Sequence, residues 1–284
     1  MPEPAARTHT VAQALALGAG MGLQRLDAQL LLLHALGRSD AGRAWLLAHD
    51  TDPVAEEPWQ TFQQLCRRRA GGEPLAYLVG VKEFFGLDLH VDPRVLVPRP
   101  DTETLVEWAL QTLAGLAPAP RVLDLGTGSG AIALAIQHAR PDARVTAIDA
   151  SAPALALAQA NAQRLGLPVA FRQGSWLQGQ NGIWDLIVSN PPYVAEGDPH
   201  LAALTHEPRA ALVATGQGLD DLRAIVEQAP PHLAPGGRLL LEHGHDQAGA
   251  VRALLAAHGY SDVTSRKDLA GIERCSGGIR PAQR

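Results

Sequence analysis

The segment Asn190-Pro191-Pro192-Tyr193 carries side chains suited to holding a flat nitrogen group. Asn190 supplies a carbonyl oxygen and an NH2 on one short side chain. The two prolines fix φ and donate no amide hydrogen, so the carbonyls around them stay available as acceptors. The Asn190 side-chain oxygen and the Pro191 carbonyl could accept both hydrogens of an amide or amine, while Tyr193 stacks on its flat face. This grip orients a planar nitrogen for in-line attack on an activated donor without a formal base.

A glycine loop predicts a second binding feature. The apolar run Val122–Leu125 is typical of a buried parallel strand, and residues 131–136 are typical of the helix that follows it. Between them, glycines remove the Cβ atoms where the chain bends, so that a ligand can approach the backbone amides at the helix N-terminus. The loop residues are Gly126, Thr127, Gly128, Ser129 and Gly130. Their G-x-G-x-G spacing differs from the dinucleotide G-x-G-x-x-G, which makes a nicotinamide cofactor the weaker expectation.

Asp149 ends the next predicted strand, residues 144–149, where a carboxylate can accept both hydroxyls of a ribose. Both NAD and S-adenosylmethionine carry a ribose with a free 2′-hydroxyl, so this residue does not separate them. The alternative is that Asp149 is only a helix N-cap before Pro153.

These candidate residues lie in a part of the chain where strand and helix signals alternate, which predicts a doubly wound, mostly parallel α/β fold. The predicted strands are 121–125, 144–149, 169–173, 184–189, 237–243, 261–266 and 272–276. The last two are expected to form an antiparallel pair. Both the glycine loop and Asn190 follow strands of this sheet at their carboxyl ends, which is where open α/β sheets bind ligands. We expect the two to form one site.

Three parts are predicted along the chain. Residues 1–80 form a small helical domain, with helices around 11–17, 26–36 and 59–69, N-caps at Thr10 or Asp27, and C-caps at Gly18 and Gly37. Residues 81–98 form a β-hairpin linker, in which the alternation through Leu89 breaks at Asp92-Pro93 and resumes at Val95. Residues 99–284 form the α/β domain.

Composition narrows the class of protein. The 284 residues are 46% hydrophobic and 19% charged, which is enough apolar surface for a core of about two domains. The formal net charge of −5 gives no broad basic footprint for a nucleic acid, so we expect no direct nucleic-acid binding. Cys66 and Cys275 match no metal spacing and no disulfide framework, and no signal pattern or membrane-length apolar run is present. These features predict a cytoplasmic protein.

Two other clusters favour structural roles. His243 and His245 lack further ligands at metal spacing, so no metal site is expected. The run Arg67–Arg69 is typical of a solvated helix face, with an acidic partner as the alternative. Glu207-Pro208-Arg209 either orders a loop over the site or forms a surface turn.

The chain resembles the HemK-like release factor glutamine methyltransferases over nearly its whole length. The resemblance rests on the glycine loop, the Asn-Pro-Pro-Tyr turn and four further segments. Those segments are Arg25–Leu32, Gly72–Gly80, Glu83–Leu87 and Val97–Glu103. Many S-adenosylmethionine enzymes share the glycine loop, and adenine-N6 DNA methyltransferases share the Asn-Pro-Pro-Tyr turn. The proline-arginine segment joined to this N-terminal part is the more specific signal.

The resemblance implies a seven-stranded class I methyltransferase sheet with S-adenosylmethionine as the methyl donor. Gly126 to Gly130 would hold the methionine end, Asp149 the ribose, and Trp176 would lie beside the adenine. Asn190 to Tyr193 would hold a glutamine amide. Relatives often have an aspartate where this chain has Ser175, which can accept only an uncharged hydrogen bond from the adenine amino group.

The activity implied is N5-methylation of the glutamine in the Gly-Gly-Gln motif of class-1 translation release factors. Two alternatives stay open. One is a methyltransferase for a ribosomal-protein glutamine or a nucleic-acid amino group, and the other is a non-catalytic S-adenosylmethionine-binding module. Residues 1–80 would recognise the partner protein.

Overall fold

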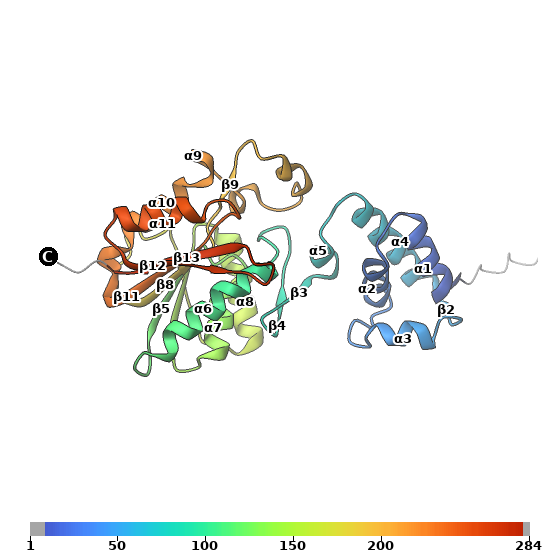
Figure 1. Ribbon diagram of the computed structural model, residues 1–284. Helices are drawn as coiled ribbons and strands as arrows, with labels where there is room; N and C mark the ends of the chain where they lie inside the picture. The colour runs from blue at the N-terminus through green and yellow to red at the C-terminus, as the bar shows by residue number, and fades with distance from the viewer. Residues whose placement is uncertain (1–8, 281–284) are drawn as a thin grey trace, which may run out of the picture. The chain divides into compact units, whose positions relative to one another are not determined.

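The computed structural model describes residues 9–280 and divides into two compact units between Val81 and Lys82. Figure 1 draws the helices of the first unit in blue to teal and the sheet of the second in green to red. Each unit has its own apolar core, so each is described by itself. Among the described residues, no helix has the length and apolar character needed to span a membrane.

The first unit is helical, as predicted. Its elements are β1 (His9–Thr10), α1 (Val11–Gly20), α2 (Arg25–Ala35), α3 (Arg43–Ala48), β2 (Pro53–Val54), α4 (Glu56–Ala70) and α5 (Leu75–Val79). The three predicted helices correspond to α1, α2 and α4. The sequence did not predict α3 and α5, which are too short to show a helical period. Leu31, Leu32 and Phe62 are fully buried in the core between the helices.

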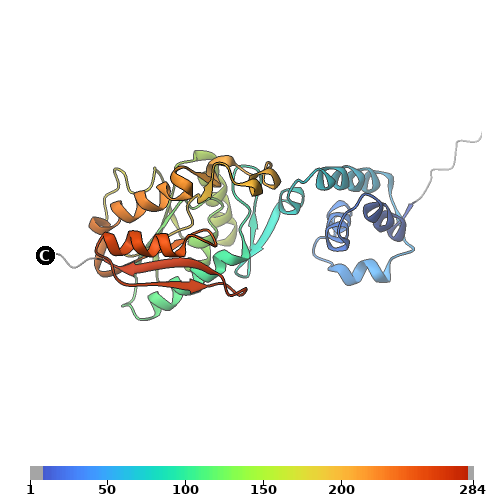
Figure 2. The same ribbon diagram turned by 45° about the horizontal axis from the view of Figure 1, so that its top comes forward.

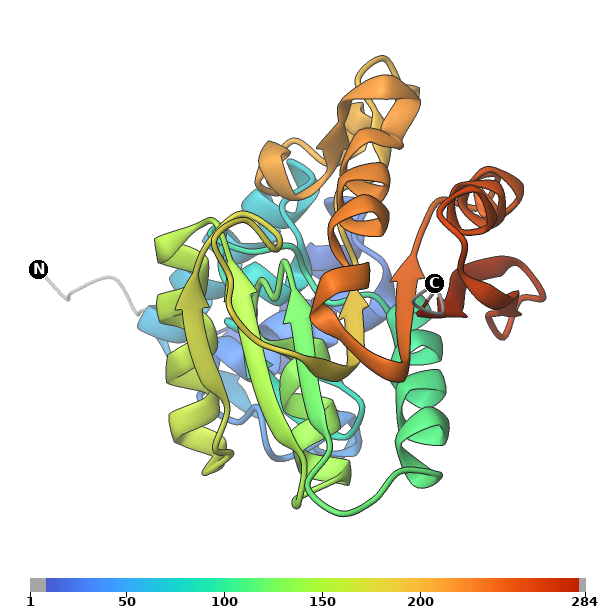
Figure 3. The same cartoon turned by 90° about the vertical axis from the view of Figure 1, so that its left-hand side faces the viewer.

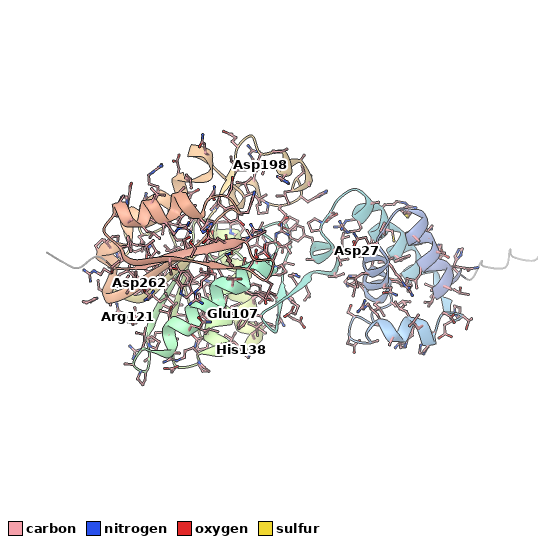
Figure 4. The ribbon with its side chains drawn as sticks, viewed as in Figure 1. Asp27, Glu107, Arg121, His138, Asp198 and Asp262 are labelled. Carbon is pink, nitrogen blue, oxygen red and sulfur yellow. The ribbon has the colours of Figure 1, made fainter. Side chains whose placement is uncertain are left out.

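Two of the predicted caps in this unit are wrong. Helix α1 continues past Gly18, which instead lies at a close helix contact, since a Cβ there would approach the Cβ of Ala28 to 2.9 Å. Asp27 lies inside the first turn of α2 and accepts a hydrogen bond of 2.7 Å from Arg69 Nε (Figure 4 labels Asp27). Thr10 does cap α1, through a capping box with Gln13. Gly37 follows the end of α2 with φ +64°.

The hairpin at the start of the second unit is shorter than predicted. Strands β3 (Val81–Phe84) and β4 (Leu87–His90) are joined by Phe85 and Gly86, whose φ values of +51° and +76° form a tight two-residue turn. No strand resumes at Val95, although Val95 is buried. Phe84, Leu87 and Leu89 belong to the core of this unit, so the hairpin is anchored on it.

The second unit is built on a seven-stranded sheet in the order β12-β13-β11-β8-β5-β6-β7. The strands are β5 (Arg121–Leu125), β6 (Arg144–Asp149), β7 (Ala170–Gln173), β8 (Trp184–Ser189), β11 (Leu233–Glu242), β12 (Ser261–Lys267) and β13 (Glu273–Ile279). Only β13 runs antiparallel to its neighbours, β11 and β12. The predicted doubly wound, mostly parallel fold is confirmed. Strand β11 begins four residues before its predicted start at 237, with an irregular register before Arg238.

Helices cover both faces of the sheet (Figure 3). They are α6 (Glu103–Ala114), α7 (Ala131–Ala139), α8 (Ala152–Leu165), α10 (Asp220–Gln228) and α11 (Ala248–Ala257). Shorter helical segments of this unit are η1 (Pro100–Thr102), α9 (Thr215–Gly218) and η4 (Pro230–His232). In β5, Val122 packs in the core with α6 and α7, whereas Leu123 packs in the core with α10 and α11. Helix α11 lies along β12 and β13 (Figure 2). Because β5 is buried on both faces from Val122 to Leu125, this part of the strand is continuously apolar except at Asp124.

The order in which the strands are added to the sheet changes direction at the pair β5 and β8. Strands β6 and β7 follow β5 on one side, and β8 then pairs with β5 on the other side. In the parallel pair, Leu125 lies opposite Ser189. The glycine loop and Asn190 therefore leave adjacent strands at the same level, at the topological switch point where such sheets bind ligands.

Candidate functional site

A cavity of about 370 Å³ opens at this switch point. It is lined by most of the predicted site residues: Gly126, Thr127, Gly128, Ser129, Asp149, Ser175, Trp176, Asn190 and Pro192. Gly130, Pro191 and Tyr193 belong to the same turns but do not line it. Other lining residues come from 94–102, from 208–211 and from Asp221.

The glycine loop is held by its own backbone more completely than the sequence suggests. Gly126, Gly128 and Gly130 all have positive φ, of +72°, +56° and +87°. The amides of Gly126 and Thr127 donate to Ile148 O, and that of Gly130 donates to Thr127 O. The Gly128 amide donates to Asp149 Oδ2 at 2.8 Å. These amides have partners within the protein, so the loop offers a ligand close approach to a backbone without side chains.

A buried carboxyl supports the loop from below. Asp124 is fully buried in β5, and its Oδ2 accepts a 2.6 Å hydrogen bond from Thr127 Oγ1. Burial raises the pKa of Asp124 to about 7, and the nearby Asp149 charge adds to the rise, while the Thr127 hydroxyl opposes it. Asn161 of α8, also fully buried, donates to Ser129 O and His90 O at 3.0 Å, which ties the loop to the hairpin.

Asp149 braces the loop as well as facing the cavity. Its Oδ2 accepts a hydrogen bond from the Gly128 amide, and its Oδ1 accepts one from the Ser151 amide, each at 2.8 Å. Asp149 is not the N-cap of α8, which was the alternative prediction. Ser151 is the N-cap, because its side chain accepts a hydrogen bond from the Ala154 amide. Each carboxylate oxygen has a second acceptor position, so two ligand hydroxyls remain chemically compatible with this residue.

Trp176 provides a flat apolar wall to the cavity. Its backbone has φ +49°, unusual for a bulky residue, and its ring packs so closely on Gly126 that a Cβ there would lie 3.2 Å from it. The indole Nε1 donates to Asp221 Oδ1 at 3.2 Å. Burial raises the pKa of Asp221, and the Trp176 bond opposes the rise. Asp221 thus brings a carboxylate to the cavity beside Trp176.

The turn that contains Asn190 is held by hydrogen bonds to residues outside it. Asn190 Nδ2 donates to Thr102 Oγ1 at 3.2 Å, so the side-chain oxygen is the end left for a ligand. The Tyr193 hydroxyl donates to Glu242 Oε1 at 3.2 Å, and the Tyr193 carbonyl accepts from Gln247 Nε2 at 3.0 Å. Burial, together with the Glu242 charge, raises the pKa of Tyr193.

Glu207 joins two segments that border the cavity. Its Oε1 pairs with Arg99, and its Oε2 accepts from the Val97 amide at 3.0 Å. Only 2% of the Glu207 side chain is exposed, so the surface-turn interpretation is wrong for this residue. The pair holds the proline-arginine segment against the loop that contains Pro208.

The two clusters assigned structural roles have partners within their own units. Both ring nitrogens of the buried His243 are hydrogen-bonded, to Gly244 O and to Ser276 Oγ. Arg68 pairs with Glu73 and Arg69 with Asp27. In residues 9–280, no group of three or more His, Cys, Asp or Glu side chains has metal-binding geometry.

Thr102, Asp221 and Glu242 were not predicted from the sequence as site residues. Glu242 had a usable signal, since it is a charged residue that closes an apolar strand run, just as Asp149 does. Thr102 and Asp221 carry no such signal, because they lie in helical segments and reach the site only through the fold.

The chain is similar to known methyltransferases over most of its length. Residues 102–267 match the family described as methyltransferase small domain, and residues 10–80 match the PrmC N-terminal domain. A protein of Bordetella pertussis named release factor glutamine methyltransferase is 56% identical, with 90% of this chain and 95% of that protein covered. Its namesake from Burkholderia pseudomallei is 50% identical, with 91% and 93% covered. A solved 16S rRNA N2 G1207 methyltransferase of Thermus thermophilus, in complex with AdoMet and guanosine, shares the fold at 22% identity. Its TM-score is 0.53, over 70% of this chain and 49% of that one.

Proposed function

Since the chain belongs to the release factor glutamine methyltransferases, we propose that it methylates the Gly-Gly-Gln glutamine of class-1 translation release factors. The methyl group would pass from the sulfonium sulfur of S-adenosylmethionine to the N5 atom of the side-chain amide, leaving S-adenosylhomocysteine, and the amide would lose one of its two hydrogens as a proton. One observation supports this proposal most strongly. Asn190 and the glycine loop follow adjacent parallel strands, and both line the same cavity at the switch point. The partner is a cytoplasmic protein, and no nucleic-acid contact is required.

The residues that line the cavity fit the donor. Apart from Gly128 and its two chain neighbours, no described protein atom lies within 4 Å of the position that a Cβ would take on Gly128, so the loop leaves open space there. Asp149 has acceptor positions for ribose hydroxyls, and the Trp176 ring offers a face for the adenine. Asp221 supplies a carboxylate acceptor beside the Trp176 ring. The donor, when bound, supplies a sulfonium methyl group that is already activated for attack.

On the acceptor side, the chain must orient an amide nitrogen, which is a weak nucleophile. Asn190 Oδ1 and the Pro191 carbonyl accept its two N–H groups and set the nitrogen in line with the methyl group. These bonds strengthen as positive charge develops on the nitrogen, so they stabilise the transition state more than the ground state. Asn190 can do this because Thr102 holds its NH2.

The proposal is tested by incubating the full-length protein with S-adenosylmethionine carrying a labelled methyl group and a class-1 release factor. Peptide mass spectrometry should then place the label on the glutamine of Gly-Gly-Gln. A release factor with that glutamine changed to glutamate is the control and should remain unlabelled. In parallel incubations with a ribosomal protein or a nucleic acid as acceptor, label there and not on the release factor would support the alternative methyltransferase. Donor binding without transfer to any of these would support the non-catalytic module.

We expect Asp149→Ala to lower the affinity for S-adenosylmethionine by about 1.5–3 kcal/mol, which is the range for a hydrogen bond to a charged group. That loss corresponds to roughly tenfold to beyond a hundredfold in Kd, measured by calorimetry. Asp142→Ala is the matched control, because Asp142 lies before the opposite end of the same strand. Unchanged affinity in a folded Asp149→Ala variant would remove Asp149 from the donor site.

The glycines at 128 and 130 should respond differently to alanine. Both have positive φ, which costs an alanine about 1–2 kcal/mol. A Cβ at Gly130 would also approach Leu134 Cδ1 to 2.9 Å, so Gly130→Ala should lose about 1–3 kcal/mol more in urea unfolding. Gly128→Ala should stay more stable but bind the donor less tightly, because its Cβ enters the cavity. Equal stabilities of the two variants would show that the Leu134 contact relaxes at no cost.

A further inference from the structure

Glu242 is a buried carboxyl next to the turn Asn190–Tyr193, which is predicted to hold the methyl acceptor and is called the acceptor turn. It is the last residue of β11, with only 1% of its surface exposed. Strand β11 pairs with β8 so that Leu241 lies opposite Ser189, which places Glu242 level with Asn190. An ionisable group is rarely buried unless a partner or a function retains it. The reaction steps described above do not use it.

Residues at both ends of the acceptor turn are connected to the surroundings of this carboxyl. The Tyr193 hydroxyl donates to Glu242 Oε1, whereas Oε2 has no hydrogen-bond partner among the described residues. The Thr102 hydroxyl stabilises the charged form of Glu242 and thereby opposes the rise of its pKa. The same Thr102 oxygen accepts from Asn190 Nδ2. Thr102 therefore holds the Asn190 amide and lies near enough to Glu242 to stabilise its charge.

The direction of these hydrogen bonds matters, because a carboxylate can only accept. If the Thr102 hydrogen points to Glu242, the Thr102 oxygen can only accept from Asn190, and the NH2 of Asn190 must face Thr102. The carbonyl oxygen of Asn190 then faces the cavity. Without an acceptor at 242, the Thr102 hydroxyl is free to donate to Asn190 Oδ1. The side-chain amide could then turn over and present its NH2 to the N–H groups of the substrate.

We propose that Glu242 is a positioning residue that fixes the polarity of the acceptor site. In this arrangement the unpartnered Oε2 of its carboxylate accepts from the Thr102 hydroxyl while Oε1 accepts from Tyr193, and this keeps the Asn190 carbonyl oxygen directed at the methyl acceptor. The inference rests on the proposed function and adds to it the residue that orients the amide grip. Glu242 itself does not touch the substrate.

The surroundings of Glu242 predict a pH dependence. Burial raises its pKa to about 7, and the charge of Asp101 adds to the rise, while Tyr193, Thr102 and Arg274 oppose it. Cys275, opposite Glu242 in β13, is a neutral neighbour, because burial and the Glu242 charge raise the pKa of its thiol. The charged form is the acceptor-only form, and its share grows as pH rises. The kcat of the full-length protein should therefore rise with pH through about 7.

The test is Glu242→Gln in the full-length protein, assayed with saturating S-adenosylmethionine and an intact release factor. Glutamine keeps the size of the side chain but presents an NH2 to Thr102 or Tyr193. We expect kcat at pH 8 to fall by about tenfold to a hundredfold, the donor Kd to stay within about twofold, and the rise of kcat through pH 7 to disappear. Glu273→Gln is the matched control, since Glu273 lies in the neighbouring β13 and pairs with Arg252 outside the cavity.

A second variant keeps the inference falsifiable if Glu242→Gln does not fold. Thr102→Val removes the link between Asn190 and Glu242 and leaves the Tyr193 bond in place, so it should lose kcat similarly with the donor Kd unchanged. Wild-type kcat and pH profile in either folded variant would overturn the inference. So would an equal loss of kcat and donor affinity, which would indicate a purely structural role. If the wild-type protein transfers no methyl group to a release factor, the proposed function fails and this inference fails with it.

Discussion

Asn190→Ala is expected to lower kcat for release factor methylation by about a hundredfold or more, because the loss of an orienting contact misplaces the attacking nitrogen. Donor affinity should change little. The side chain makes one described hydrogen bond within the protein, to Thr102, so the fold should be nearly unaffected. The measurement is kcat at saturating concentrations of both substrates, together with donor Kd by calorimetry. A selective loss of kcat would assign Asn190 to the reacting amide.

Asn181→Ala is the matched control for this prediction. Asn181 is exposed in the loop before β8 and does not line the cavity, so its removal should leave kcat and donor affinity unchanged. Wild-type turnover by Asn190→Ala on the release factor would show that the amide grip is wrong. A parallel loss of donor affinity would instead place Asn190 mainly in the donor site.

Deletion of residues 1–80 is expected to lower kcat/KM for an intact release factor by at least about a hundredfold, which is roughly 2.7 kcal/mol of transition-state stabilisation. A glutamine side chain offers too few atoms to identify one protein among many, so specificity requires a second surface. The first unit has its own core and matches the PrmC N-terminal domain, which makes it the candidate surface. Donor binding should survive, since the residues that line the cavity all belong to the second unit.

A short peptide that contains Gly-Gly-Gln separates recognition from catalysis. The truncated and full-length proteins should methylate this peptide at similar rates, because neither can use a second surface on it. Circular dichroism and donor calorimetry establish that the truncated protein is folded. If the folded truncation methylates the intact factor at the full-length rate, residues 1–80 have another role. If it loses the peptide activity equally, the first unit is needed for catalysis rather than for recognition.

Much of the sheet could be predicted from the sequence, because strands buried on both faces need continuous apolar runs. Strands β5, β6 and β8 were predicted with the bounds that the structure has. Two of them are followed by the glycine loop and the Asn190 turn. The parallel pairing of β5 and β8 then brings these two turns together without any further information.

The hairpin shows where local pattern misleads. The alternation of apolar residues continues to Val97, so the sequence favours a strand that resumes after Asp92-Pro93. In the structure the chain turns earlier, at Phe85 and Gly86, and Val95 and Val97 are buried without forming a strand. Burial in a core requires an apolar side chain but no particular backbone, so the pattern alone could not decide between the two.

The sequence by itself determined the sheet, the loop that predicts a donor site and the polar turn that predicts an acceptor site, because each depends on residues that are consecutive in the chain. Only the tertiary structure decided what holds that turn. Asn190 meets Thr102 across 88 positions, and Tyr193 meets Glu242 across 49. Hydrogen bonds between such distant residues depend on strand order and register, which no local spacing encodes. The left-handed backbone of Trp176 is likewise maintained by the packing of its ring on Gly126 and its bond to Asp221.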